Sequence, residues 1–138
     1  MSRKVNKIVK LIAGLLIIVP LLCQLFTFEK FSAVLTSAGI TPYLSLPIAI
    51  LLVIAELMSL PFLIDMNISK KAILVSRVSG FLSLGIMTAI GFLAFANGHA
   101  AVMFGATIKN VNNVTAIFLI FVMWVLLICA NSSTKQTA

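Results

Sequence analysis

One carboxylate inside an apolar segment is the residue best placed to do chemistry. Glu56 stands in the run Leu51 to Leu60, where most neighbours are aliphatic. An ionisable side chain at the centre of a bilayer costs roughly 2.5–3.5 kcal/mol on insertion scales, so it faces other helices and is either protonated or beside a hydrogen-bond donor. Two interpretations stay open. Glu56 is either a neutral acid that donates one structural hydrogen bond between helices, or a group that handles a ligand, a proton or a quinone.

Four polar side chains at similar depth are the candidate partners of Glu56. Ser59 lies one helical turn away on the same face, and Pro61 frees the carbonyl oxygen of Leu57. The other candidates belong to two later apolar segments, and they are Ser83, Thr88 and Trp124. With Glu56 these residues form the predicted ligand or proton site.

Redox and metal chemistry find little support in the residue types. Cys23 lies toward the outer end of the first apolar segment and Cys129 at the inner end of the fourth, so we expect no disulfide bond between them and no dithiol chemistry. His99 is the single histidine and has no cysteine or acid near it in the sequence. We therefore predict no catalytic constellation, no metal site and no bound cofactor. Contact with a quinone has no residue-level support, and a non-enzymatic role is favoured.

The segments that must position these residues are membrane spans. The chain has 138 residues, 62% of them hydrophobic and 9% charged, with a mean hydropathy of +1.21, which excludes a soluble enzyme. Four apolar runs approach the roughly 20 residues that cross a hydrocarbon layer of about 30 Å as a helix. The predicted spans are residues 8–28, 44–64, 73–95 and 114–130, followed by a tail over 131–138. We predict an all-α fold, with residues 1–138 forming one transmembrane four-helix bundle.

A short amphipathic helix is predicted between the first two spans. Its apolar residues recur at three- and four-residue steps, and they are Phe28, Phe31, Val34, Leu35 and Ala38. Gly39 is the expected stop, and we expect the helix to lie in the outer interface with Glu29 and Lys30 facing water. The second outer connection, residues 96–113, has a composition that predicts no particular structure.

The charge distribution predicts the orientation in the membrane. The chain carries 10 Lys and Arg against 3 Asp and Glu, and in an apolar chain such an excess orients helices rather than contacting nucleic acid. With four spans, one side of the membrane receives Arg3, Lys4, Lys7, Lys10, Lys70, Lys71, Arg77 and Lys135, and the other receives Lys30 and Lys109. We therefore predict cytoplasmic N- and C-termini in a multi-pass protein of the plasma membrane.

The third span contains small residues at four-residue spacing. The pairs Ser76 with Gly80 and Gly85 with Ala89 follow the pattern that lets helix backbones approach closely in lipid. We interpret these four residues as helix-packing positions, in preference to a cofactor groove.

The order of these features resembles a known family. A basic first span is followed by Phe28-Glu29-Lys30-Phe31, then by Gly39-Ile40 before Thr41-Pro42-Tyr43, and by Ile54-Ala55-Glu56-Leu57 in a leucine-rich second span. Over roughly residues 7–97 the chain resembles DoxX-like and MauE-like membrane proteins. The resemblance implies a small four-helix bundle that accompanies membrane redox enzymes or assists the assembly of partner proteins, with Glu56 at the position of the second-span glutamate. The chain lacks the cysteine pair of redox-active members, which argues against electron transfer by the protein itself.

Two functions of different class remain. The first is a non-catalytic membrane subunit or accessory assembly factor of a partner complex that is linked to redox chemistry. The second is a small proton- or cation-coupled transporter that uses Glu56 and acts as a dimer. The expected partners are the lipid bilayer and either another protein or further copies of the chain, with no nucleic acid.

Overall fold

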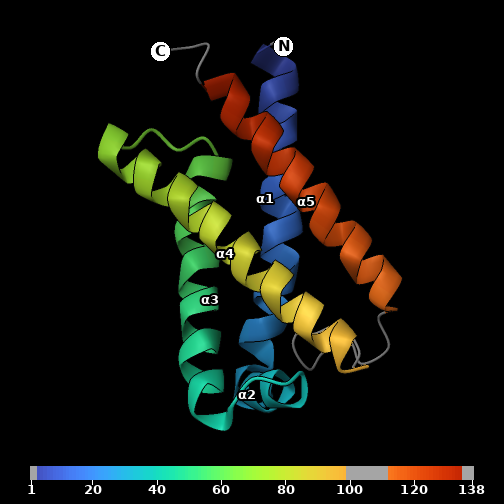
Figure 1. Ribbon diagram of the computed structural model, residues 1–138. Coiled ribbons are helices and arrows are strands. Elements are labelled where there is room, and N and C mark those ends of the chain that lie inside the picture. The colour runs from blue at the N-terminus through green and yellow to red at the C-terminus, as the bar shows by residue number, and fades with distance from the viewer. Residues whose placement is uncertain (1–2, 99–111, 135–138) are drawn as a thin grey trace.

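Five helices make up the computed structural model, which describes residues 3–98 and 112–134 (Figure 1). In chain order they are α1 (Arg3–Phe26), α2 (Phe28–Ser37), α3 (Pro42–Leu63), α4 (Lys70–Ala96) and α5 (Asn113–Thr134). His99 and Lys109, the middle of the second outer connection and the last four residues of the tail lie outside the described residues. The all-α fold predicted from the sequence is confirmed.

Four of these helices are long and apolar enough to cross a membrane. The candidate spans are Lys7–Phe26, Pro42–Leu63, Lys70–Ala96 and Val114–Ser132. The first ends before the predicted limit because the chain turns at Thr27 and Phe28 already begins α2. Helix α4 begins at Lys70, where the hydroxyl of Ser69 accepts a hydrogen bond from the Ala72 N–H at 3.3 Å. Helix α5 continues through residues 131–134, which the hydropathy pattern assigns to the tail.

The four long helices close into a bundle. Helices α3 and α4 pack together most extensively, α1 packs against both α3 and α5, and α4 also packs against α5. In Figure 1, α1 and α3 run side by side while α4 and α5 cross them obliquely, and α1 begins at the same end of the bundle at which α5 ends. We call this end, which carries Lys7, Lys10, Lys70, Lys71 and Arg77, the basic end.

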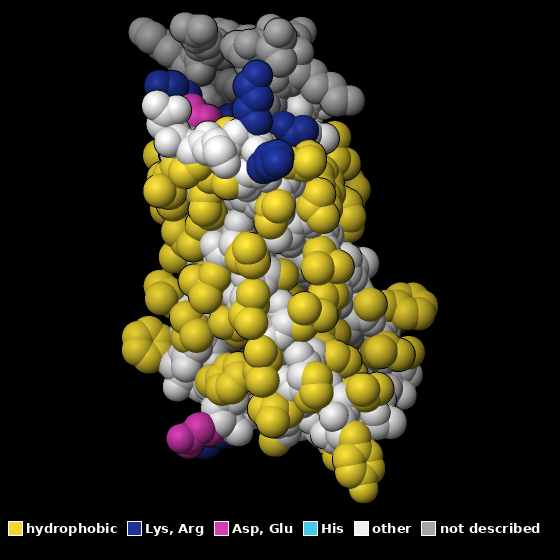
Figure 2. All heavy atoms as spheres, turned by 90° about the vertical axis from the view of Figure 1, so that its left-hand side faces the viewer, with side chains coloured by type: hydrophobic (Ala, Val, Ile, Leu, Met, Phe, Trp, Pro, Cys, Tyr) yellow, Lys and Arg dark blue, Asp and Glu magenta, His cyan; other side chains and the backbone are white. Residues whose placement is uncertain are grey.

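The outer surface of the bundle is apolar over most of its height. All four long helices expose large apolar side chains, for example Leu11, Leu51, Val78 and Phe121. Figure 2 shows a broad hydrophobic band between Lys and Arg side chains at one end and a small charged group at the other. Because such a surface is stable in lipid and not in water, the chain is a multi-pass membrane protein in contact with the bilayer.

The amphipathic helix α2 closes the end opposite the basic end. Phe31 and Leu35 are buried against the bundle, while Glu29 and Lys30 are exposed, as the spacing predicts. The helix stops before Gly39, whose φ of +105° is a left-handed conformation that favours glycine. The side chain of Asn97, which follows α4, donates to the Ala38 carbonyl at 3.0 Å and so ties the end of α2 to the end of α4.

Candidate functional site

Glu56 lies inside the bundle, and its hydrogen-bond partner comes from α1. The Glu56 side chain is 1% exposed, and the amide of Gln24, which is fully buried, donates from Nε2 to Glu56 Oε1 over a long 3.5 Å. The second carboxyl oxygen, Oε2, has no hydrogen-bond partner among the described residues. Sequence reasoning missed Gln24, although it is the only amide side chain between Asn6 and Asn67.

Ser59, one helical turn after Glu56, and Ser76 join α3 to α4. The Ser59 hydroxyl donates to the Glu56 backbone carbonyl at 2.6 Å, so it bonds the main chain of Glu56 and not the carboxyl group. The Ser76 hydroxyl donates to the Ser59 carbonyl at 3.1 Å and accepts from the Phe62 N–H at 2.9 Å. Because Pro61 has no N–H, the Leu57 carbonyl loses its bond within α3. The Ser76 hydroxyl bonds the α3 backbone on both sides of Pro61, at Ser59 and at Phe62.

The buried face of α4 around Gly80 and Ser83 contributes close packing rather than an acid–base partner. The Ser83 hydroxyl is buried but donates to the Gly80 carbonyl of its own helix at 3.0 Å. A Cβ atom placed on Gly80 lies only 3.4 Å from the Ser59 Cβ and 3.6 Å from a methyl group of Leu127. Ser76 and Gly80 therefore lie where α4 meets its neighbours.

Thr88 and Trp124 form a separate pair. The indole N–H of Trp124 in α5 donates to Thr88 Oγ1 of α4 at 3.0 Å, and the Thr88 hydroxyl donates to the Leu84 carbonyl at 2.7 Å. Thr88 is exposed and Trp124 is half-buried, with the ring of Phe81 6.0 Å away. The five residues predicted to surround one site thus divide into an interior group of Glu56, Ser59 and Ser83 and an outward-facing pair.

Gly85 and Ala89, unlike Ser76 and Gly80, lie on the exposed side of α4. Both are exposed, and a Cβ atom placed on Gly85 meets no other atom within 4 Å. They share the outward side of α4 with Thr88, because residues three and four apart lie on one helix face. Together Gly85, Thr88, Ala89 and Trp124 make an outward surface of small and polar groups, which we call the α4–α5 patch.

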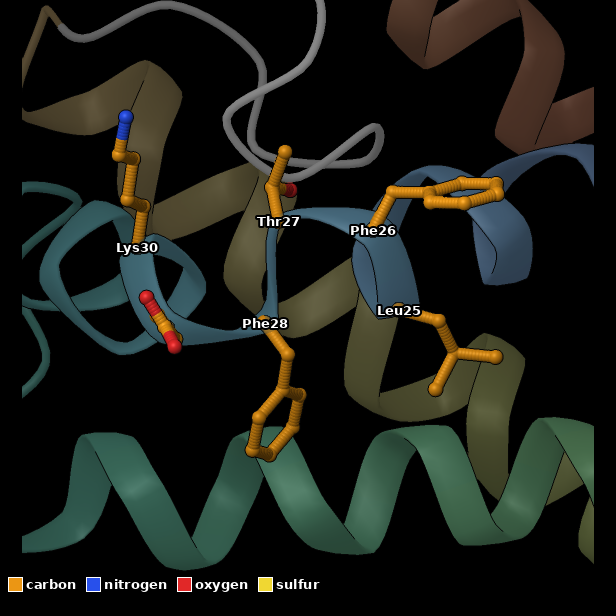
Figure 3. Close-up of a pocket in the computed structure, with 6 residues that line it drawn as sticks. Leu25, Phe26, Thr27, Phe28 and Lys30 are labelled. Atoms are coloured by element: carbon orange, nitrogen blue, oxygen red, sulfur yellow. The ribbon is translucent and has the colours of Figure 1, made fainter.

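An open groove of about 380 Å³ marks the corner between α1 and α2. It is lined by six consecutive residues, Leu25, Phe26, Thr27, Phe28, Glu29 and Lys30. In Figure 3 the Phe28 ring points toward α3, while Thr27 and Lys30 point to the opposite side. Since the lining side chains diverge and come from a single turn of the chain, the groove is a helix corner without convergent polar groups.

Comparison with protein-family models, with curated proteins and with solved structures finds no match to this chain. The fold and the surface define it as a multi-pass, all-helical membrane protein. Its function is argued from the two groups of polar residues described above.

Proposed function

We propose that this chain is a non-catalytic membrane subunit or assembly factor that binds another membrane protein through the α4–α5 patch. The resemblance to DoxX-like and MauE-like proteins extends the proposal to a partner complex that is linked to redox chemistry. The orientation that goes with it has both termini in the cytoplasm, with the basic end at the cytoplasmic face of the plasma membrane.

The observation that carries the proposal is the outward position of the Thr88–Trp124 hydrogen bond beside Gly85. Trp124 lies midway along α5, so the pair is far from either interface, where Trp side chains usually anchor a protein. Lipid offers no hydrogen-bonding groups at this depth, and the space beside the exposed Gly85 is open. Small residues beside polar side chains are typical of a contact with another transmembrane helix.

Purification of the tagged chain from its native membrane in mild detergent tests the proposal. We expect a stoichiometric protein partner with the unaltered chain. Gly85→Leu should lose that partner, because the leucine side chain projects from the patch and prevents close approach of another helix. Ile54→Phe is the matched control, since it adds bulk at an exposed position on α3, and it should retain the partner. A partner that is retained equally by Gly85→Leu contradicts the proposal.

A proton- or cation-coupled transporter is the second candidate, and the free Oε2 atom of Glu56 favours it. Glu56 faces an amide and no cation among the described residues, so the neutral acid is the form that the interior accommodates. A carboxyl group that exchanges a proton for a cation loses this ability when it becomes an amide. A clean homodimer whose proton-coupled uptake is abolished by Glu56→Gln, without loss of folding, supports this candidate over the first.

A further inference from the structure

A buried lysine lies at the basic end, where α1 meets the end of α3. Lys10 is 7% exposed, and its Nζ atom lies 2.8 Å from Asp65 Oδ1 and 5.3 Å from the centre of the Phe62 ring. The Asp65 side chain is 51% exposed, so this carboxylate is partly hydrated while the lysine is not. The pair joins α1 to the segment that follows α3 at the basic end.

Asp65 occupies a position that is normally unfavourable for an acid. Its φ of +58° is left-handed, and the Met66 N–H donates to the Pro61 carbonyl at 3.1 Å. Helices that end with this hydrogen bond usually have glycine at the left-handed position, where this chain has Asp65. A negative charge at a helix C-terminus is also repelled by the helix dipole. The ion pair with Lys10 is the interaction that offsets both costs, so the carboxylate is committed to that lysine.

A second cation approaches the same ring with no carboxylate of its own. The guanidinium carbon of Arg77 in α4 lies 5.3 Å from the centre of the Phe62 ring. Its Nε atom is buried and has no hydrogen-bond partner among the described residues. Among the residues whose side chains the structure describes, Lys10–Asp65 is the one ion pair, so Arg77 faces the Phe62 ring without a carboxylate partner.

A small cavity opens beside this cluster. Its volume is about 50 Å³, several times the roughly 10–15 Å³ that one water molecule requires. It is lined by Lys10, Pro61, Phe62, Asp65, Met66 and Ile73. Exposed Lys7, Lys70 and Lys71 add further positive charge to this end, and Figure 2 shows Lys and Arg side chains directly beside the hydrophobic band.

We propose that Arg77, with Lys10 beside it over the Phe62 ring, binds the phosphate group of an anionic phospholipid. The unmatched positive charge requires an anion, and a guanidinium group with an unused N–H donor suits phosphate oxygens. A lipid is the favoured source because the exposed face of α4 next to the cluster is apolar, with Leu74, Val78 and Leu82 available to an acyl chain. Basic pockets between spans at the membrane surface are suited to such headgroups.

Thermal unfolding of the purified chain in neutral detergent tests the proposal with three probes: phosphatidylglycerol, phosphatidylcholine and inorganic phosphate. We expect phosphatidylglycerol to raise the melting temperature in a concentration-dependent manner, and the other two to have little effect. Arg77→Gln should weaken the apparent affinity for phosphatidylglycerol about tenfold, because it removes a charge-assisted contact. Lys30→Gln, at the opposite end, should leave the response unchanged.

Each other outcome overturns the proposal. An equal rise with inorganic phosphate makes the site one for free phosphate, and an equal rise with phosphatidylcholine removes the requirement for an anion. An unchanged response in Arg77→Gln removes the arginine from the site. If that variant does not fold, Arg77→Lys keeps the charge but loses the planar donors, so it should show an intermediate affinity. The response of the unaltered chain to the three probes tests the binding of an anionic phospholipid without any variant.

Discussion

The two halves of α4 carry small residues at the same spacing and use them differently. Ser76 and Gly80 are buried, and a Cβ atom placed on Gly80 is already in van der Waals contact with the Cβ atom of Ser59 at 3.4 Å. Gly85 and Ala89 are exposed, and the space beside Gly85 is open. The spacing of small residues therefore predicts that a helix contact exists but not which helix makes it, because both pairs satisfy the same four-residue rule.

The largest expected difference in stability is between leucine variants of Gly80 and Gly85. Gly80→Leu should lower the free energy of unfolding by about 2–3 kcal/mol, because the added side chain has no room between Ser59 and Leu127. Gly85→Leu should leave the isolated chain as stable or make it more stable by up to about 1 kcal/mol, since leucine is the better helix former. Thermal unfolding of both variants in the same detergent checks the pair, and an equal loss in both would remove the distinction between the two halves.

A second prediction concerns the interior carboxyl group. Glu56→Ala should cost about 1–3 kcal/mol of stability, because it opens a void and leaves the Gln24 amide without the carboxyl acceptor. Glu56→Gln should stay close to the unaltered chain, since the amide has a similar volume and keeps an acceptor oxygen for Gln24. The free energies of unfolding of both variants, measured in the same detergent, test this prediction. If Gln proves as destabilising as Ala, Glu56 is ionised and has a cationic partner.

Ser76 and Ser83 give a matched pair within the buried half of α4. Ser76→Ala should cost about 1–2 kcal/mol, because the Phe62 N–H and the Ser59 carbonyl both lose the hydroxyl that bonds them from α4. Ser83→Ala should cost less, since that hydroxyl bonds only a carbonyl of its own helix. Chemical unfolding of the two single variants is the comparison. The bridging role of Ser76 is wrong if the order of the two losses is reversed.

The smallest expected effect belongs to the outward pair. Trp124→Phe removes the indole donor to Thr88 but keeps an aromatic ring, and Thr88 retains its bond to the Leu84 carbonyl. We expect less than about 0.6 kcal/mol of lost stability, the average for hydrogen bonds between membrane helices. A loss near 2 kcal/mol in the isolated chain would place the pair among the interactions that hold the bundle together.

Local patterns in the sequence were sufficient for the helices and not for the contacts between them. The four apolar runs predict the spans, and the three- and four-residue steps followed by Gly39 predict α2. The partner of Glu56 was not predicted because equal depth was assumed for side chains at similar positions in each span. Gln24 lies two residues before the end of α1, whereas Glu56 lies 14 residues after the start of α3. The end of α1 therefore lies beside the middle of α3. A hydropathy profile shows where each helix begins and ends, but not how far two helices are shifted along one another.

The sequence also did not show which polar side chains of α4 and α5 face the interior of the bundle and which face outward. Thr88 and Trp124 were predicted to lie beside Glu56 because all three are polar and fall at similar depth in their apolar segments. Rotation of a helix about its own axis decides whether such a residue faces inward, and α4 and α5 have almost no amphipathic asymmetry that indicates this rotation. In a membrane, both faces of a helix are apolar, so the exposed side cannot be recognised by its polarity.

A photo-reactive phenylalanine analogue placed at position 89 in cells tests the central claim most directly. The claim is that the α4–α5 patch contacts a transmembrane helix of another protein. We predict that irradiation links position 89 to one protein of defined mass, and that the same analogue at position 54, on the exposed face of α3, gives no such product. Links from position 89 to lipid alone, or the same products from both positions, would contradict the account.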